Sequence, residues 1–229
     1  MMSLELTALA GGYGQAAVVH PTDLTVRAGE VTALIGRNGA GKTTLLRTVF
    51  GLADRHGGTV VLDGRKLPPG RPDLLAGAGG TLMPEDRGVF PSLTVAENLR
   101  LARRRDFAPA VDPYEVFPLL TDRAGQLSGS LSGGQKQQLG IARAMLAGRS
   151  LIAVDELTQG LQPSVVTDVL DALGTIAEAG VAVLLVDQHA GALLDRSHHA
   201  VAMEAGRVVL DAPNGPGLRD RLDEILAVR

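Results

Sequence analysis

One run of nine residues constrains the fold of this 229-residue chain more than any other feature. The run consists of Gly36, Arg37, Asn38, Gly39, Ala40, Gly41, Lys42, Thr43 and Thr44. An apolar stretch at residues 31–35 precedes it and predicts a buried strand, and a helix is predicted from Lys42 to about Phe50. Glycine adopts positive φ angles without steric cost, so successive backbone N–H groups can point into one concavity. The chain is therefore expected to contain a strand, a tight loop and a helix in that order.

The same loop predicts a binding site for phosphate groups. Its pattern, Gly followed by four residues and then Gly-Lys-Thr, is that of a Walker A phosphate loop. The backbone N–H groups and the helix N-terminus attract phosphate oxygens, Lys42 neutralises the β- and γ-phosphates, and Thr43 places its hydroxyl on Mg²⁺. Thr44 is assigned to the α-phosphate because this loop resembles known phosphate loops, in which the corresponding residue makes that contact. The predicted ligand is ATP with Mg²⁺, and the predicted contacts are Gly36, Asn38, Gly39, Ala40, Gly41, Lys42, Thr43 and Thr44.

A second apolar stretch, residues 151–154, ends in the acidic pair Asp155 and Glu156. In phosphate-loop enzymes an aspartate at such a strand end holds Mg²⁺, directly or through water. A carboxylate next to it can accept the proton of an attacking water, which is the catalytic role predicted for Glu156. Taken alone, this pair would be interpreted as an ordinary acidic turn. Together with Lys42 it predicts a Walker B strand of a nucleotide hydrolase.

Leu131-Ser132-Gly133-Gly134-Gln135 opens a predicted helix at residues 133–147. The order of phosphate loop, helical insertion, this LSGGQ signature and acidic strand resembles the ATP-binding cassette (ABC) family over nearly the whole chain. That resemblance implies that Ser132, Gly133, Gly134 and Gln135 contact the γ-phosphate of an ATP held by the opposite subunit. A serine hydroxyl, two exposed glycine amides and a helix N-terminus suit that role. Without this context the segment would be a serine-glycine turn that caps a helix.

Three further site residues rest on the resemblance. Tyr13 lies where the family places an aromatic ring that stacks on adenine, although a tyrosine at a strand edge needs no such role. Glu85 stands where most members carry a glutamine that senses the metal and the γ-phosphate. The alternative interpretation of Glu85 is a surface carboxylate with no role in the site. Gln188 aligns with the switch histidine of most members. It can donate to a γ-phosphate oxygen but cannot carry a proton, and His189 could substitute if the loop shifts by one residue.

Residues 84–95, 97–99, 116–119 and 186–189 resemble one subgroup, the ATPase subunit of branched-chain amino acid importers and of related amide or urea importers. The implied fold is α/β: a phosphate-loop NTPase core with a mainly parallel sheet, an antiparallel β subdomain and an inserted α-helical subdomain. We expect a single ABC ATPase domain over residues 1–229, with the helical subdomain at about 86–130. Helices are expected at 94–105, 113–120, 163–179 and 218–228, and further strands at 4–9, 18–26, 59–62, 79–83, 181–186, around 201 and at 208–210.

The composition limits the kinds of partner and binding site that the chain is expected to have. Hydrophobic residues make up 45% and charged residues 21%, which is typical of a globular domain. The formal net charge of −3 gives no electrostatic case for a nucleic-acid partner, and the absence of cysteine excludes disulfides and thiolate metal sites. No signal peptide is expected, and no apolar run approaches the roughly 18 residues of a spanning helix. We therefore expect a cytoplasmic protein, and the family resemblance implies that it reaches the inner face of the membrane through a permease.

The main hypothesis is an ATP-hydrolysing subunit of an ABC importer. The resemblance implies a second ABC ATPase subunit, identical or related, together with transmembrane permease subunits and, indirectly, a solute-binding protein. Two alternatives stay open. The replacement of the switch histidine by Gln188 suggests a regulatory nucleotide-binding module with little hydrolysis. A soluble ABC ATPase of DNA repair or translation is the other, although such proteins usually carry coiled-coil insertions or two cassettes.

Overall fold

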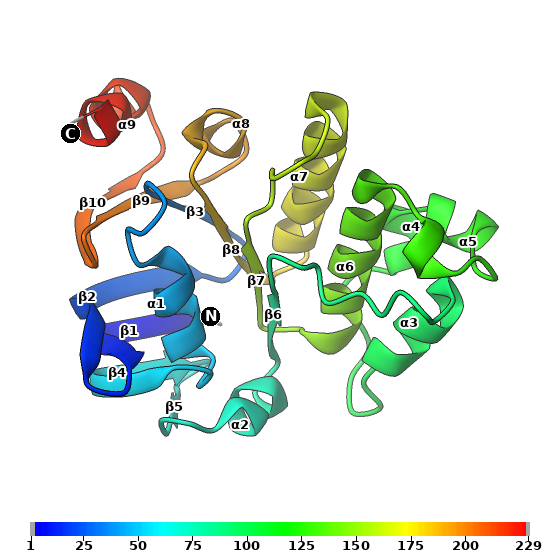
Figure 1. Cartoon of the computed structure of the whole chain (residues 1–229), viewed down its shortest axis with the longest axis horizontal. Helices are drawn as coiled ribbons and strands as arrows, with labels where there is room; N and C mark the ends of the chain where they lie inside the picture. The colour runs from blue at the N-terminus through cyan, green and yellow to red at the C-terminus, as the bar shows by residue number, and fades with distance from the viewer. Residues whose placement is uncertain (1–2, 228–229) are drawn as a thin grey trace.

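The computed structural model describes residues 3–227, and Figure 1 shows its elements. The strands are β1 (Ser3–Tyr13), β2 (Ala16–Arg27), β3 (Val31–Ile35), β4 (Asp54–Leu62), β5 (Arg65–Leu67), β6 (Gly80–Met83), β7 (Leu151–Asp155), β8 (Ala182–Asp187), β9 (His199–Glu204) and β10 (Arg207–Pro213). The helices are α1 (Lys42–Val49), α2 (Pro72–Gly77), α3 (Val95–Ala102), α4 (Pro113–Val116), α5 (Leu119–Asp122), α6 (Gly133–Ala147), α7 (Pro163–Glu178), α8 (Ala190–Leu194) and α9 (Leu218–Ala227), with a 3₁₀ turn at Ser128–Ser130. Val228, the predicted end of the last helix, lies outside the described residues.

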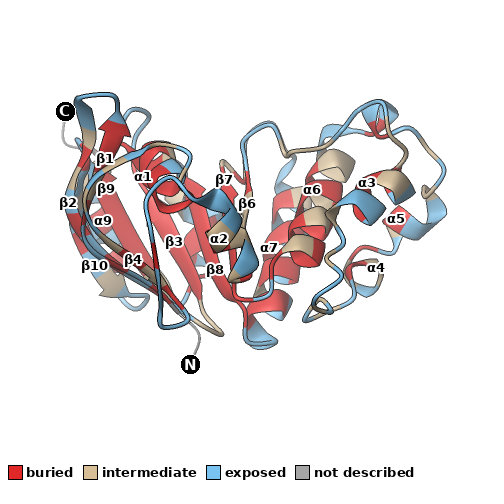
Figure 2. Ribbon diagram, turned by 90° about the horizontal axis from the view of Figure 1, so that it is seen from below, coloured by how far each residue is buried: buried red, intermediate tan, exposed pale blue. Residues whose placement is uncertain are grey.

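A six-stranded sheet in the order β10-β9-β3-β8-β7-β6 forms the centre of the molecule. The neighbouring strands from β9 to β6 pair in parallel, and only β10 runs antiparallel to its neighbour. Every residue of β3, β7 and β8 is buried, and Figure 2 shows these strands inside the molecule. Because the carboxyl ends of parallel strands meet at one edge, the segments after β3, β7 and β8 lie close together.

Side chains of the central sheet alternate between two apolar layers. Leu34 and Leu184 belong to the layer that also contains α1 and the antiparallel strands, whereas Ile35 and Leu185 face the layer of α6 and α7. Successive residues of a strand point to opposite faces, so a strand covered on both sides is largely apolar. This explains why residues 151–154 and 181–186 are continuous apolar runs and why Thr32 alone interrupts the run at 31–35.

A second sheet, in the order β2-β1-β4-β5, is antiparallel and packs on α1. The combination of this sheet, the parallel sheet and the helices confirms the predicted fold class. The strands are longer than the sequence pattern indicated, since β1 extends from 3 to 13 and β4 from 54 to 62. Glycines and polar residues at their ends hid these extensions, because such residues are depleted in strands.

The segment before the signature differs in detail from the prediction. A single helix at 113–120 is wrong: Pro118 follows the end of α4, and α5 starts only at Leu119. Proline lacks the N–H that would continue the helical hydrogen bonding. The helix predicted at 94–105 is shorter, and Thr94 caps it by accepting from the Glu97 N–H. Figure 1 shows α3, α4 and α5 grouped at one end of the molecule beside α6.

Two short helices, α2 and α8, were not predicted, and each has fewer than seven residues. Such segments offer too little periodicity to be recognised in a sequence. Across residues 3–227 the helices are all too short or too polar to cross a lipid bilayer.

Ala8 breaks the regular pairing of β1. Its φ angle is +46°, in the left-handed region, and its N–H donates to Asp23 Oδ1 over 2.7 Å. Opposite it, Gly58 also has a positive φ, and a Cβ at Gly58 would lie only 2.3 Å from the Ala8 carbonyl oxygen. A left-handed alanine is strained by roughly 1–2 kcal/mol. The first strand therefore holds an unfavourable residue at a bulge.

Replacing Ala8 by Gly is expected to raise the free energy of unfolding by about 0.5–1 kcal/mol, because relief of the strain exceeds the added flexibility of the unfolded chain. Urea unfolding of the two proteins measures this difference. Ala17→Gly is the matched control, since Ala17 is exposed on β2 and has no positive φ. The control should lose about 0.5–1 kcal/mol. Destabilisation by both substitutions would contradict the assignment of strain to Ala8.

Candidate nucleotide site

The loop between β3 and α1 makes a tight turn that requires glycine. Gly41 caps α1 with a φ of 99°, and Gly39 has a φ of 80°. A Cβ at Gly36 would lie 2.5 Å from the Met203 carbonyl oxygen, so the backbone approaches β9 more closely than any side chain allows. The loop lines a pocket of about 150 Å³ together with Val18 of β2 and Glu156. Its other lining residues are all predicted phosphate contacts: Asn38, Gly39, Ala40, Gly41, Lys42, Thr43 and Thr44.

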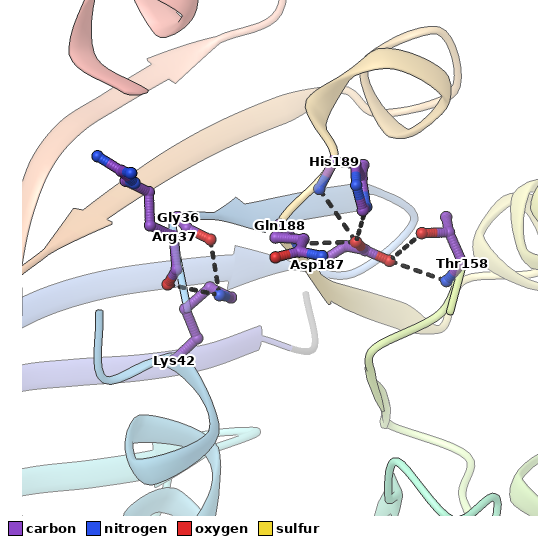
Figure 3. Close-up of polar contacts among 7 residues, drawn as sticks. All are labelled: Gly36, Arg37, Lys42, Thr158, Asp187, Gln188 and His189. Atoms are coloured by element: carbon purple, nitrogen blue, oxygen red, sulfur yellow. Dashed lines mark hydrogen bonds and ion pairs between the residues drawn. The ribbon is translucent and has the colours of Figure 1, made fainter. Parts of the chain in front are cut away.

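Lys42 is the buried cation of this site. Its ammonium donates to the carbonyl oxygens of Gly36 and Arg37, over 2.7 and 3.1 Å, as Figure 3 shows. Burial lowers the pKa of Lys42, while the charges of Glu156, Asp155 and, more weakly, Asp187 partly offset that effect. The ammonium is therefore held by the backbone of the loop, and three carboxylates lie close enough to influence its charge.

Thr43 and Asp155 come together from two elements. The Thr43 hydroxyl on α1 donates to Asp155 Oδ1 at the end of β7 over 3.3 Å. Hydroxyl and carboxylate oxygens are the ligands that Mg²⁺ prefers, so this pair fits the predicted metal. Within the described part of the chain, His, Asp and Glu side chains form no group of three that could hold a metal by themselves. The remaining ligands would therefore be phosphate oxygens and water, as is usual for Mg²⁺.

Glu156 lies one residue beyond Asp155 in an unusual backbone conformation. Its φ is +53°, and its N–H donates to the Val186 carbonyl oxygen over 2.9 Å. Burial, followed by repulsion from Glu85 and Asp155, raises the pKa of Glu156. Burial also raises the pKa of Asp155, and Glu85 adds to that effect. Glu85 itself is exposed on the loop after β6, within electrostatic range of both carboxylates.

Gln188 and His189 follow β8 and differ in orientation. In Figure 3 the Gln188 side chain extends from Asp187 on the side of Lys42, whereas the His189 ring lies on another side of Asp187. The His189 Nδ1 is 3.3 Å from Asp187 Oδ1, and its side chain is 69% exposed. Both residues are exposed, and the assignment of Gln188 to the switch position stays a prediction.

Asp187 was not predicted to be a site residue, yet it organises two loops. Its Oδ2 accepts from the Thr158 N–H and hydroxyl, both over 2.8 Å, and its Oδ1 accepts from the backbone N–H groups of Gln188 and His189. The side chain is only 4% exposed. The available signal was the position of an acidic residue at the end of a fully apolar strand, next to the acidic end of β7.

The remaining predicted residues lie apart from the loop. Tyr13 ends β1, is 45% exposed and accepts a hydrogen bond from Arg47 over 3.4 Å; it does not line the pocket. Ser132 caps α6 and exchanges hydrogen bonds with Gln135. A Cβ at Gly134 would lie 2.9 Å from a Val165 methyl group, so α6 packs closely on α7 there. In both views of the fold, β6 and β7 separate α6 from α1. A single chain therefore does not bring Ser132 to Lys42.

The chain is similar to proteins of one known family. Residues 19–159 match the ABC transporter family. The chain is 34% identical over 203 residues to the high-affinity branched-chain amino acid transport ATP-binding protein BraG of Pseudomonas aeruginosa, covering 86% of this chain and 87% of that one. It is 30% identical over 214 residues to the probable branched-chain amino acid transport ATP-binding protein LivF of Archaeoglobus fulgidus, covering 91% of each. A nucleotide-free ATP-binding cassette from an ABC transporter, 21% identical, superposes with a TM-score of 0.88 and covers 99% of this chain and 98% of that one. The last comparison shows the fold alone.

The parallel sheet, the glycine loop and the acidic end of β7 define a phosphate-loop nucleotide-binding protein. The family match over residues 19–159 shows further that the chain belongs to the ABC transporter family. It is an ATP-binding subunit of an ABC transporter and an ATP-hydrolysing enzyme, as the sequence predicted.

Glu156→Gln is expected to raise the thermal unfolding midpoint at pH 7 in magnesium-free buffer. The folded pKa of Glu156 is raised, so its ionised form costs stability above that pKa, and the cost disappears as the pH falls below the unfolded value of about 4.3. The gain should therefore shrink between pH 7 and pH 4. Exposed Glu224→Gln on α9 is the control, with an expected change below about 0.5 kcal/mol. A pH-independent gain would contradict the electrostatic explanation.

Gln188→Ala is expected to lower the ATP turnover rate by roughly tenfold or more, because it removes the side-chain donor predicted for the γ-phosphate. His189→Ala should change the rate by less than about twofold, since its exposed ring contacts only Asp187. Steady-state phosphate release at saturating ATP compares the two variants. A larger loss for His189→Ala would identify the histidine as the switch residue.

Proposed function

We propose that two copies of this cassette, or this chain and a related one, pair head to tail and hydrolyse two ATP molecules between them to drive solute import. The observation that carries the proposal is the separation of two half-sites within one chain. Helix α1, which begins at Lys42, and helix α6, which Ser132 caps, lie on opposite sides of β6 and β7. A partner in the opposite orientation brings its signature to this loop, and this chain does the same for the partner.

Each residue of the half-site has a role in that arrangement. The loop amides and Lys42 bind the phosphates, and Thr43 and Asp155, with Glu85 nearby, hold Mg²⁺. Glu156 orients the attacking water and accepts its proton, for which a carboxylate with a raised pKa is better suited than an ordinary one. Gln188 donates to the γ-phosphate. Tyr13 stacks on the adenine ring at the end of β1, where its exposure leaves the ring accessible.

The partner supplies the remaining contacts. Ser132 with the amides of Gly133 and Gly134 faces the γ-phosphate from the opposite subunit, and Gln135 fixes Ser132 through the capping hydrogen bonds. The N-terminus of the 15-residue helix α6 adds positive potential there. Closure of the pair excludes water and completes the donors around the transferred phosphoryl group, and hydrolysis allows the pair to reopen.

The proposed solutes are branched-chain amino acids or related amides. Support comes from residues 84–95 and 186–189, which resemble that subgroup, and from the two relatives whose names specify branched-chain amino acid transport. The permease and a solute-binding protein select the solute. The cassette itself is placed on the inner face of the membrane through the permease, which receives motion from the helical subdomain at about 86–130.

A regulatory cassette with little hydrolysis is the second candidate, because Gln188 cannot carry a proton. Glu156 argues against it. The Glu156→Gln variant decides between the two: an active importer subunit should lose roughly 100-fold or more in ATP turnover while still binding ATP. Phosphate release measures the rate, and a filter-binding assay with labelled ATP measures the affinity. A wild type no faster than the variant would exclude the importer ATPase as proposed.

A further inference from the structure

One arginine connects three segments of this chain on which the proposed hydrolysis depends. Arg87 lies two residues after Glu85, in the turn that follows β6. Its guanidinium donates from Nε to Gln137 Oε1 over 2.8 Å and from its terminal nitrogen to the Gln159 carbonyl oxygen over 3.4 Å. Gln137 belongs to the signature helix α6, and Gln159 lies three residues after Glu156.

Gln137 completes this connection from the core. Its side chain is 2% exposed, and its amide nitrogen donates to the Leu157 carbonyl oxygen over 3.3 Å. The two ends of one buried amide therefore contact Arg87 and the residue directly after Glu156. A buried amide with both ends bonded holds a single orientation, because any rotation would leave a donor or acceptor unsatisfied.

The backbone around Arg87 is also fixed against α6. Arg87 has a φ of 67°, and its N–H donates to the Pro84 carbonyl oxygen over 2.8 Å. A Cβ at Gly140 of α6 would lie 2.9 Å from the Arg87 carbonyl oxygen, so the helix and the turn are in direct contact. Arg87 thus adopts a strained left-handed conformation at the point where the loop carrying Glu85 meets the helix that carries the signature.

We propose that Arg87, acting through Gln137, is a positioning residue for ATP hydrolysis. It holds the loop of Glu85, the segment after Glu156 and the signature helix in fixed relative positions. The metal contact, the water-activating carboxylate and the signature that faces the partner are therefore positioned together. Arg87 does not line the phosphate-loop pocket. The inference rests on the proposed ATPase function and predicts an effect on turnover rather than on ATP binding.

The test uses the full chain, with ATP turnover, ATP affinity and thermal unfolding measured for each variant. Arg87→Met keeps most of the apolar stem and removes the guanidinium. It should lower kcat roughly tenfold or more, as expected for loss of a charge-assisted hydrogen bond, and leave the ATP Kd within about twofold. Arg87→Lys keeps the positive charge, but a single ammonium cannot reach both acceptors as the planar guanidinium does. Its kcat should therefore lie between those of the wild type and Arg87→Met. Exposed Arg65→Met on β5, far from these contacts, should match the wild type.

A double-substitution cycle gives a readout that general loss of structure would not produce. Gln137→Met should lower kcat to a similar extent, and the double variant should be no slower than the slower single variant, because both disrupt one connection. Independent, multiplying effects would overturn the proposal, as would an Arg87→Met rate equal to that of wild type or a parallel loss of ATP affinity. Glu156→Gln runs in the same assay. If the wild type is no faster than Glu156→Gln, the proposed function has failed; if only Arg87→Met is unaffected, the inference alone has failed.

Discussion

The structure depends on holding several carboxylates close together within electrostatic range of the buried ammonium of Lys42. Lys42 carries the positive charge, and Asp155, Glu156 and Asp187 all act on it from the ends of β7 and β8. Parallel strands bring these ends to the same edge, so the topology itself creates the repulsion. Burial and neighbouring charges raise the pKa values of Asp155 and Glu156, so the ionised forms of these two carboxylates cost stability in the folded chain. A cation of higher charge, bound at Thr43 and Asp155, would relieve it.

The fold limits this cost by giving its most deeply buried carboxylate many donors. Asp187 accepts from the Thr158 N–H and hydroxyl and from the N–H groups of the next two residues, so its charge is dispersed over fixed dipoles. The same bonds join the segment after β7 to the segment after β8. The same hydrogen bonds therefore stabilise the charge of Asp187 and hold the two loops in position. Any movement of Thr158 that breaks them leaves a buried charge poorly solvated, which resists independent motion of the two loops.

The sequence predicted most of this architecture because its signals were local. Apolar runs gave the central strands, and the glycine loop, the Asp155–Glu156 pair and the Ser132 cap each follow from short segments. The missed features depend on tertiary contacts between distant segments. Asp187 and Thr158 are 29 residues apart and Arg87 and Gln137 are 50 residues apart, so no pattern in one segment identifies either pair. The helix predicted across Pro118 was wrong because helical periodicity outweighed a local stop signal.

Polar contacts also determine which movements the molecule can make. The signature helix α6 is tied through Gln137 to Leu157 and Arg87, so the segment after Glu156 and the loop of Glu85 must follow it when it tilts. By contrast, the outer elements α3, α4 and α5 contact the rest of the chain mainly through α6. A force applied to that outer group therefore reaches the carboxylate cluster through α6, and a change at the cluster reaches the outer group by the same route. The nucleotide site and the outer helices are thus coupled through a few hydrogen bonds near the N-terminus of α6.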